Sequence, residues 1–242
     1  MLLSHTTGIV DYGSINWVVQ AFLADPARVW SPEEIVQAAL DEGPSFLPGE
    51  QFQYSNTNTF ILGMLIEQLT GRTIKEEMQA RIFTSLGLTR TYFPTTPFID
   101  DALARGYAEL NGTLTDFTDF SPSFPWAAGA IISTLSDMKT YVEALVGGRL
   151  LGPVMQQERM SWWEAKSAGF WGEGYPSSRY GLYLMSYGGF VGHSGDSIGF
   201  ATMAVSNPTT GDTIVFMSNS GSFDHNLFLK KVIQIVFPEI SL

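Results

Sequence analysis

The sequence of 242 residues contains no cysteine and only three histidines, His5, His193 and His225. The lack of cysteine excludes disulfide scaffolds, thiolate metal sites and cysteine nucleophiles. Three imidazoles placed so far apart along the chain do not form a metal-binding motif. The sequence therefore predicts no metal site and no cofactor.

Positive charge is also scarce, because 13 Lys and Arg residues oppose 24 Asp and Glu residues and leave a net charge of −11. Nucleic acids and anionic membrane surfaces both attract basic surfaces, so neither is an expected partner. No apolar run approaches the ~18 residues of a membrane span, and no signal peptide is visible. Hydrophobic residues still make up 45% of the chain, which is enough to fill a core.

The most apolar stretch of the chain predicts a helix over residues 57–69. Its large apolar side chains leave only a narrow polar strip, so we expect most of its circumference to be buried. Either Ser55 or Asn56 would cap its first turn, and Gly71 suits the left-handed position at its end. The apolar residues are Phe60, Ile61, Leu62, Met64, Leu65, Ile66 and Leu69.

Tyr54 and Asn56 stand at the start of this predicted helix. The positive end of the helix dipole would favour the anionic form of a phenol, which is what a tyrosine needs to carry protons near neutral pH. On these residues alone, a capping Asn beside a core Tyr is the favoured interpretation. Both interpretations remain open at this point.

Helices dominate the first part of the chain and strands the last part, which predicts an α+β fold. Ser31 and Thr73 each begin a capping-box pattern, and Asn111-Gly112 is typical of a two-residue hairpin. Further helices are predicted over residues 14–24, 135–146 and 224–237, strands over 180–187, 200–206 and 213–218, a turn over 207–212 and a loop over 167–178.

Two serines match motifs of nucleophilic catalysis. Ser197 lies in a G-x-S-x-G pattern with His225 downstream, but the apolar run after it predicts a strand where the nucleophile elbow needs a helix. Ser136 and Lys139 form an S-x-x-K pattern, although Thr134 and Asp137 explain the same stretch as a helix start. We therefore expect neither serine to be the nucleophile.

A third arrangement pairs Tyr54-Ser-Asn56 with His193-Ser-Gly195, and here the chain resembles a known family. Five ordered segments carry the resemblance: LLSHTTG at 2–8, PGEQFQYSN at 48–56, AGAIIST at 128–134, YGL at 180–182 and GHSGDSIGF at 192–200. They are similar to the serine β-lactamase and penicillin-binding superfamily. The nearest branch contains class C β-lactamases, D-alanyl-D-alanine carboxypeptidases of the Streptomyces type and family VIII esterases.

The resemblance implies a β-lactamase/transpeptidase-like fold, an antiparallel sheet flanked by helices plus a helical subdomain. Tyr54 would be the proton shuttle, Asn56 would bind the substrate, and His193 would donate towards Tyr54 and the substrate. The strand through Ser194, Gly195 and Asp196 would pair with the substrate backbone, with the Asp196 N–H as part of an oxyanion hole.

The family nucleophile is a serine in S-x-x-K that precedes the LLSHTTG segment. We therefore expect residues 1–242 to form a single β-lactamase-like domain that lacks its N-terminal part. On its own, this chain is expected to be catalytically inactive. Its helical part would cover residues 14–175 and its C-terminal sheet and helix residues 180–242. Such a domain could oligomerise through the surface that the missing part leaves exposed.

The substrate is expected to be a small ester, amide or peptide. No Lys or Arg lies between Arg179 and Lys230, and Asp196 adds a negative charge, so a substrate carboxylate would be repelled. This favours an esterase or an amidase over a β-lactamase. The nearest enzyme alternative is a D-alanyl-D-alanine carboxypeptidase. The alternative from another class is a catalytically dead binding module.

The remaining candidates are predicted to be structural. His5 fits a buried imidazole with satisfied hydrogen bonds, and His225, at a helix start, fits a surface position. The tryptophans Trp162, Trp163 and Trp171 fit an acyl pocket and a core equally well. By resemblance the protein would act in the periplasm or outside the cell, although the sequence leaves the cytoplasm open.

Overall fold

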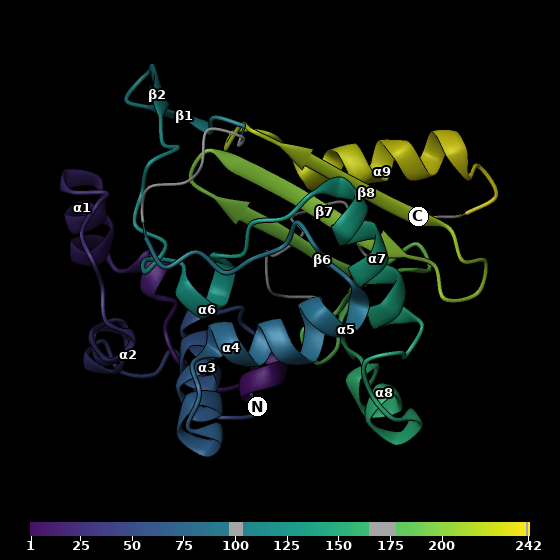
Figure 1. Cartoon of the computed structure of the whole chain (residues 1–242), viewed down its shortest axis with the longest axis horizontal. Helices are drawn as coiled ribbons and strands as arrows, with labels where there is room; N and C mark the ends of the chain where they lie inside the picture. Colours follow the sequence, from purple (N-terminus) through teal and green to yellow (C-terminus); the bar gives the residue numbers. More distant parts are fainter. Residues whose placement is uncertain (97–103, 165–177, 241) are drawn as a thin grey trace. The chain divides into compact units, whose positions relative to one another are not determined.

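The computed structural model describes residues 1–96, 104–164, 178–240 and 242. The described chain contains helices and antiparallel strands, which confirms the predicted α+β class (Figure 1). It divides into two compact units, each built from separate stretches of sequence. Unit 1 contains Met1–Ser85, Thr91–Ala104 and Thr118–Ile132, and unit 2 contains Leu86–Arg90, Arg105–Phe117 and Ser133–Leu242. The single domain expected from the sequence stays a prediction.

Unit 1 is helical. Its helices are η1 (Leu2–Ser4), η2 (Tyr12–Ser14), α1 (Asn16–Ala24), α2 (Pro32–Asp41), α3 (Asn56–Thr70), α4 (Ile74–Met78), the π-helical turn η3 (Gln79–Phe83) and α6 (Trp126–Gly129); α5 (Thr84–Leu86) continues η3.

Helix α3 is the predicted apolar helix, and its first half forms part of the core. Phe60 is fully buried, with its ring centroid 5.1 Å from that of Tyr12 and 5.3 Å from that of Trp126. The expectation that most of the helix is buried is wrong for its C-terminal half. There, Ile66 and Leu69 are 37% and 76% exposed, whereas the buried residues of α3 all lie between Thr57 and Gly63.

The ends of the helices follow the sequence signals closely. Gly71 ends α3 in the left-handed conformation, with φ 67°, and Thr73 begins α4 with a complete capping box. The second capping box is wrong in one detail. The Ser31 hydroxyl accepts the Glu34 N–H as predicted, but the Glu34 carboxylate forms an ion pair with Arg28.

Unit 2 contains a six-stranded antiparallel sheet in the order β3-β4-β5-β6-β7-β8, and a separate hairpin of β1 and β2. The hairpin turns at Asn111 and Gly112, whose φ angles of 51° and 77° suit the predicted two-residue turn. The strands are β1 (Tyr107–Leu110), β2 (Thr113–Asp116), β3 (Trp163–Glu164), β4 (Arg179–Tyr180), β5 (Met185–Tyr187), β6 (Phe190–Ser197), β7 (Phe200–Ser206) and β8 (Thr213–Ser218), with helices α7 (Leu135–Val146), α8 (Pro153–Arg159) and α9 (His225–Val236).

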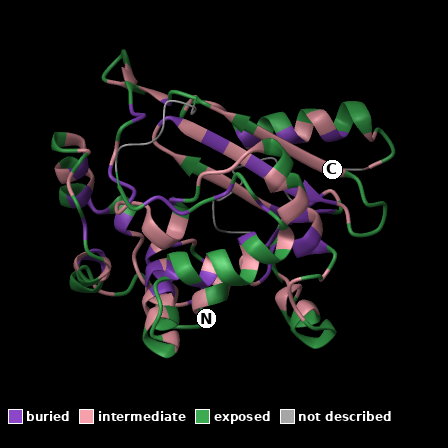
Figure 2. Ribbon diagram, viewed as in Figure 1, coloured by how far each residue is buried: buried purple, intermediate pink, exposed green. Residues whose placement is uncertain are grey.

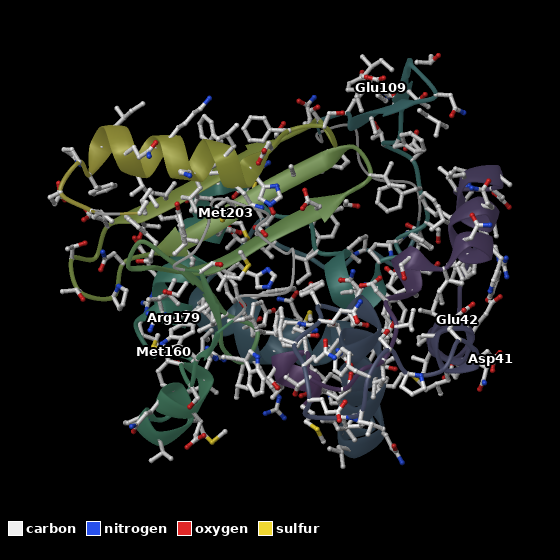
Figure 3. All side chains as sticks on the ribbon, turned by 180° about the vertical axis from the view of Figure 1, so that it is seen from behind. Asp41, Glu42, Glu109, Met160, Arg179 and Met203 are labelled. Atoms are coloured by element: carbon white, nitrogen blue, oxygen red, sulfur yellow. The ribbon has the colours of Figure 1, made fainter. Side chains whose placement is uncertain are left out.

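Helices cover both faces of the sheet. Residues Val142, Leu145 and Val146 of α7 pack with Val191 of β6 and Ala204 of β7. The opposite face of β6 and β8 contacts the other helix, since Phe216 lies against Phe228 of α9 and Phe190 against Phe237 just after it. Strand β7 lies between the two helices and most of its residues are buried (Figure 2), and Figure 3 labels Met203, a fully buried residue of this strand.

The sequence pattern misses several strands. The run predicted as one strand over 180–187 is two strands, β4 and β5, with Tyr183 at a φ of 52° between them. Hydrophobic alternation gives no signal for β6, because Gly192, Ser194 and Gly195 interrupt it; only the family resemblance implied a strand there. The loop predicted over 167–178 lies outside the described residues, apart from Ser178, as does Trp171.

Candidate functional site

The predicted site residues fall into two groups, one in each unit. Tyr54 and Asn56 lie at the start of α3 in unit 1, where the Tyr54 hydroxyl donates to Asn56 Oδ1 over 3.3 Å. His193, Ser194, Gly195 and Asp196 lie on β6 in unit 2. Different contacts build the two groups.

An aspartate that the sequence analysis did not single out holds the start of α3. One carboxylate oxygen of Asp11, Oδ2, accepts both the backbone N–H of Asn56, at 2.6 Å, and its side-chain Nδ2, at 3.0 Å. The other oxygen, Oδ1, accepts the N–H of Gly13 at 2.7 Å. Burial raises the pKa of the Asp11 carboxyl, and the N–H donors of Asn56 and Gly13 oppose this shift.

The capping prediction is therefore wrong in its choice of residue. Ser55 occupies the N-cap position, yet within the described chain its side chain makes no capping hydrogen bond. Asp11 takes this role from 45 residues away in the sequence. The one available signal was the Asp-x-Gly turn at residues 11–13, which predicts a bend but not the direction of its carboxylate.

His5 supports the same helix start from the other side. It is fully buried, and its Nδ1 lies 3.2 Å from both the backbone nitrogen of Ser55 and Nδ2 of Asn58. Because Nδ1 accepts the Ser55 N–H, the ring carries its proton on Nε2. The His5 ring centroid lies 4.3 Å from that of Tyr54. The predicted burial of His5 is confirmed and its Nδ1 accepts a hydrogen bond, but its position beside Tyr54 was not foreseen.

In unit 2, His193 has a defined tautomer. Its Nδ1 lies 2.5 Å from the carbonyl oxygen of Ser194, and a carbonyl can only accept, so Nδ1 carries the proton. Nε2 then accepts from the Tyr180 hydroxyl at 2.9 Å. Burial lowers the pKa of His193, and the nearby His225 adds to this effect, whereas the Ser194 carbonyl opposes it. The ring is therefore a neutral imidazole around pH 7.

Strand β6 is paired unevenly along its length. Strand β7 pairs with it from Val191 to Ser197, whereas β5 pairs with it only at Phe190, Val191 and Gly192. On the β7 side the packing is close at Gly195, where a Cβ atom would come within 2.7 Å of Thr202 Oγ1. A side chain at this position would force the Thr202 hydroxyl to move.

The prediction that His225 is a surface residue is wrong. His225 begins α9, is 6% exposed, and its Nδ1 lies 3.1 Å from Oδ1 of Asp196. The side chain of Asp196 itself is 62% exposed. The pairing follows from the register, since β6 residues 192, 194 and 196 project towards the face of the sheet that α9 covers.

Neither of the two competing serines lies where its motif requires the nucleophile. Ser197 ends β6 and only two residues separate it from β7, so the G-x-S-x-G pattern lies in a hairpin and not in an elbow before a helix. Ser136 lies exposed in the first turn of α7, and Lys139 pairs with Glu143 at 2.6 Å. The Lys139 ammonium is thus engaged by Glu143 on the same helix, as an i,i+4 pair, and its pairing argues against a role beside Ser136.

The described residues contain no group of three or more His, Asp or Glu side chains suited to hold a metal ion. Within the same residues, no helix is long and apolar enough to cross a membrane.

The α+β fold, with a Tyr-x-Asn motif at a helix start and a His-Ser-Gly motif on an antiparallel strand, defines the class of β-lactamase and transpeptidase-like proteins. A comparison with family models agrees, because the model described as Beta-lactamase matches residues 1–232. The chain therefore belongs to the β-lactamase family, which confirms the resemblance.

Individual relatives are amidohydrolases, peptidases and esterases by name. A crystal structure of a D-stereospecific amidohydrolase from Streptomyces sp. matches with a TM-score of 0.88 and 29% identity, over 99% of this chain and 72% of that one. A D-aminopeptidase of Brucella anthropi is 33% identical over 141 residues, which are 57% of this chain and 26% of that protein. A lovastatin esterase of Penicillium rubens is 30% identical over 154 residues, 61% of this chain and 34% of that protein. The chain thus spans less than two thirds of the length of these curated relatives.

Proposed function

We propose that this chain carries the proton-transfer and substrate-binding residues of a serine hydrolase that transfers an acyl group from an ester or an amide. The observation that carries the proposal is the group at the start of α3, where the Tyr54 hydroxyl donates to Asn56 Oδ1 and Asp11 holds the Asn56 amide. A phenol ordered in this way can exchange a proton with a nucleophile and a leaving group.

Each residue has a separate proposed role. Tyr54 moves the proton, and the second N–H of Asn56 Nδ2 donates to the substrate carbonyl. His193 supports proton transfer as a neutral imidazole, consistent with its lowered pKa. Residues 194–196 of β6 pair with the substrate backbone, and the Asp196 N–H contributes to an oxyanion hole. The uneven pairing of β6 supports the role of residues 194–196, because β5 pairs with β6 only at residues 190–192 and does not extend along residues 194–196.

The nucleophile is the remaining element of the reaction. The sequence contains one S-x-x-K pattern, at Ser136 and Lys139, and the ion pair of Lys139 with Glu143 argues against its use. We therefore propose that the chain on its own binds substrate without forming an acyl-enzyme. A catalytically dead binding module is the second candidate function, and the same observation favours it.

The proposed substrate is an amide or ester of an amino acid without a carboxylate next to the reacting group. Asp196 is largely exposed on β6, and no Lys or Arg lies between Arg179 and Lys230. A carboxylate would meet like charge there, which costs about 1 kcal/mol at 4 Å in water and more where water is partly excluded. The names of the D-aminopeptidase and the D-stereospecific amidohydrolase support an amide of a D-amino acid.

A binding experiment with matched ligands tests this proposal. We expect D-phenylalanine amide to shift NMR signals of Asn56 and of His193 along the same binding curve. D-phenylalanine has a carboxylate in place of the amide, and its affinity should be lower by a factor of about five or more. Neither p-nitrophenyl acetate nor the amide should be hydrolysed. Equal binding of both ligands would contradict the substrate class, and turnover abolished by Ser136→Ala or Ser197→Ala would contradict the choice of nucleophile.

We further propose that the chain self-associates and that the protein acts in the periplasm or outside the cell. The exposed apolar side chains at the end of α3, Leu65, Ile66 and Leu69, support self-association. The location rests on the family resemblance. Sedimentation velocity on the chain and on a Leu65→Lys, Leu69→Lys variant tests the first point, since only the unaltered chain should form oligomers.

A further inference from the structure

The orientation of the Asn56 side chain is determined by its neighbours. An amide presents an oxygen on one side and an NH₂ group on the other, and the two are distinguished only by their partners. The Asp11 carboxylate is acceptor-only when ionised, so the group 3.0 Å from its Oδ2 must be the Nδ2 of Asn56. The amide oxygen then faces the Tyr54 hydroxyl at 3.3 Å, and the hydroxyl donates to it.

The carboxylate that selects this orientation is itself fixed. Its second oxygen, Oδ1, accepts the Gly13 N–H at 2.7 Å, within the turn that Asp11 begins. The first oxygen, Oδ2, accepts the Asn56 backbone N–H at 2.6 Å, a length typical of a strong, charge-assisted hydrogen bond. Three N–H donors therefore hold one carboxylate in a single position.

A capping residue alone would not require this arrangement. A cap needs only the bond to the backbone N–H, which satisfies the helix end. The additional hydrogen bond, from Asn56 Nδ2 to Asp11 Oδ2, fixes the side-chain amide of Asn56. The oxygen of this amide is the group that contacts the Tyr54 hydroxyl. The first turn of α3 also has a separate support, since Thr57 Oγ1 accepts the Tyr12 N–H and donates to the Val10 carbonyl.

We infer that Asp11 is a positioning residue that fixes the orientation of the Asn56 amide and, through it, the direction of the Tyr54 hydroxyl. This inference rests on the proposed function for its catalytic meaning, although the positioning itself is a property of the described structure. Without the carboxylate, the amide can turn over and present NH₂ to Tyr54, which leaves the hydroxyl to point elsewhere. Asp11 acts through Asn56 and need not touch the substrate.

The variant Asp11→Asn tests the inference with little change of shape. An asparagine has one acceptor oxygen where the aspartate has two, so it cannot satisfy both Gly13 and Asn56. Asp25→Asn is the matched control, because Asp25 also accepts the N–H two residues ahead, that of Ala27 at 3.2 Å, but is exposed and contacts no side chain of the site.

The first readout is the side-chain NH₂ signal of Asn56 in the ¹⁵N-labelled chain. In the unaltered chain and in Asp25→Asn we expect two separate proton shifts and slow solvent exchange. In Asp11→Asn we expect the shifts to move together and exchange to accelerate about tenfold, the factor for losing one hydrogen bond to a charged group. An Asn56 signal that is the same in all three proteins would overturn the inference.

The second readout separates this inference from the proposed function. If the unaltered chain binds D-phenylalanine amide, Asp11→Asn should bind it about tenfold more weakly and Asp25→Asn equally well. Equal binding by Asp11→Asn, despite a changed Asn56 signal, would overturn the positioning role. If the unaltered chain binds no such amide, the proposed function fails, and the Asn56 signal alone decides the inference. Where Asp11→Asn unfolds, acid titration of the unaltered chain replaces it, and the Asn56 signal should then follow protonation of Asp11.

Discussion

The start of α3 and the strand β6 carry their proposed functional residues in different ways. At α3, the contacts come from far along the chain, since Asp11 and His5 lie 45 and 50 residues from the positions they hold. On β6, His193 is held by its neighbour Ser194 and by Tyr180, 13 residues away, and Gly195 by the packing of the adjacent strand. The first group thus depends on buried polar contacts between distant segments, and the second on the geometry of one sheet.

This difference predicts that substitutions which remove a polar side-chain atom lower the stability of the first group most. Thr57→Val keeps the size of a fully buried residue but removes the acceptor of the Tyr12 N–H and the donor to the Val10 carbonyl. We expect a loss of about 2–3 kcal/mol in the free energy of unfolding, because the buried Tyr12 N–H and the half-buried Val10 carbonyl both lose their partner. Urea denaturation measures this loss.

Thr70→Val is the control for that experiment. Thr70 lies at the other end of α3, and its hydroxyl donates to the Ile66 carbonyl within the helix. Its loss should change stability by no more than about 0.5 kcal/mol. Similar effects of the two substitutions would mean that the polar contacts at the start of α3 do not hold it.

Steric changes should harm the second group. In Gly195→Ala the new methyl group would lie 2.7 Å from Thr202 Oγ1, closer than real Cβ atoms approach other atoms. We expect a loss of about 1–2 kcal/mol through overpacking. The double variant Gly195→Ala, Thr202→Ala should regain most of it, and a double-mutant cycle from urea denaturation measures this coupling. Additive effects would show that β7 does not impose the glycine.

The same difference explains what the sequence could reveal. Local signals were reliable: the capping box at Thr73, the Asn111-Gly112 hairpin, the left-handed Gly71 and the strand at Phe200–Ser206 all occur as predicted. Each depends on a few adjacent residues, whose conformational preferences survive folding.

What was missed depends on contacts between distant segments. Nothing adjacent to Asp11 indicates that its carboxylate binds Asn56, and nothing adjacent to His225 indicates that the sheet buries it against Asp196. Strand β6 was not predicted from hydrophobic alternation, because the glycines and polar residues of its His-Ser-Gly motif interrupt that alternation. The family resemblance supplied Tyr54, Asn56 and His193, but not the residues that orient them.

A smaller effect concerns the protonation of His193. Burial lowers its pKa below the ordinary 6.5, so below pH 6.5 the unfolded chain binds a proton that the folded chain does not. Its contribution to stability is therefore complete above pH 6.5 and declines as the pH falls. The Tyr180 hydroxyl donates to Nε2 and so favours the neutral ring, and Tyr180→Phe should raise the pKa of His193 and reduce this decline.

Proton NMR titration of the His193 ring measures its pKa, and urea denaturation measures how the free energy of unfolding changes with pH. Both cover pH 5 to pH 8, about 1.5 units on each side of the ordinary pKa. His193→Gln is the reference variant, since it removes this contribution altogether. A His193 pKa that is unchanged or lower in Tyr180→Phe would show that the hydroxyl does not stabilise the neutral ring.

The smallest effect on stability is expected at Asp196, whose side chain is 62% exposed beside the buried His225. Asp196→Asn should change the free energy of unfolding by less than about 1 kcal/mol, because solvent screens an exposed pair. The variant should nevertheless bind D-phenylalanine about fivefold more tightly than the unaltered chain does, since removing a like charge at 4 Å is worth about 1 kcal/mol in water. Affinity for N-acetyl-D-phenylalanine amide, which is uncharged, should not change. Calorimetry with these two ligands distinguishes charge repulsion from a structural effect, since a structural effect would alter both affinities together.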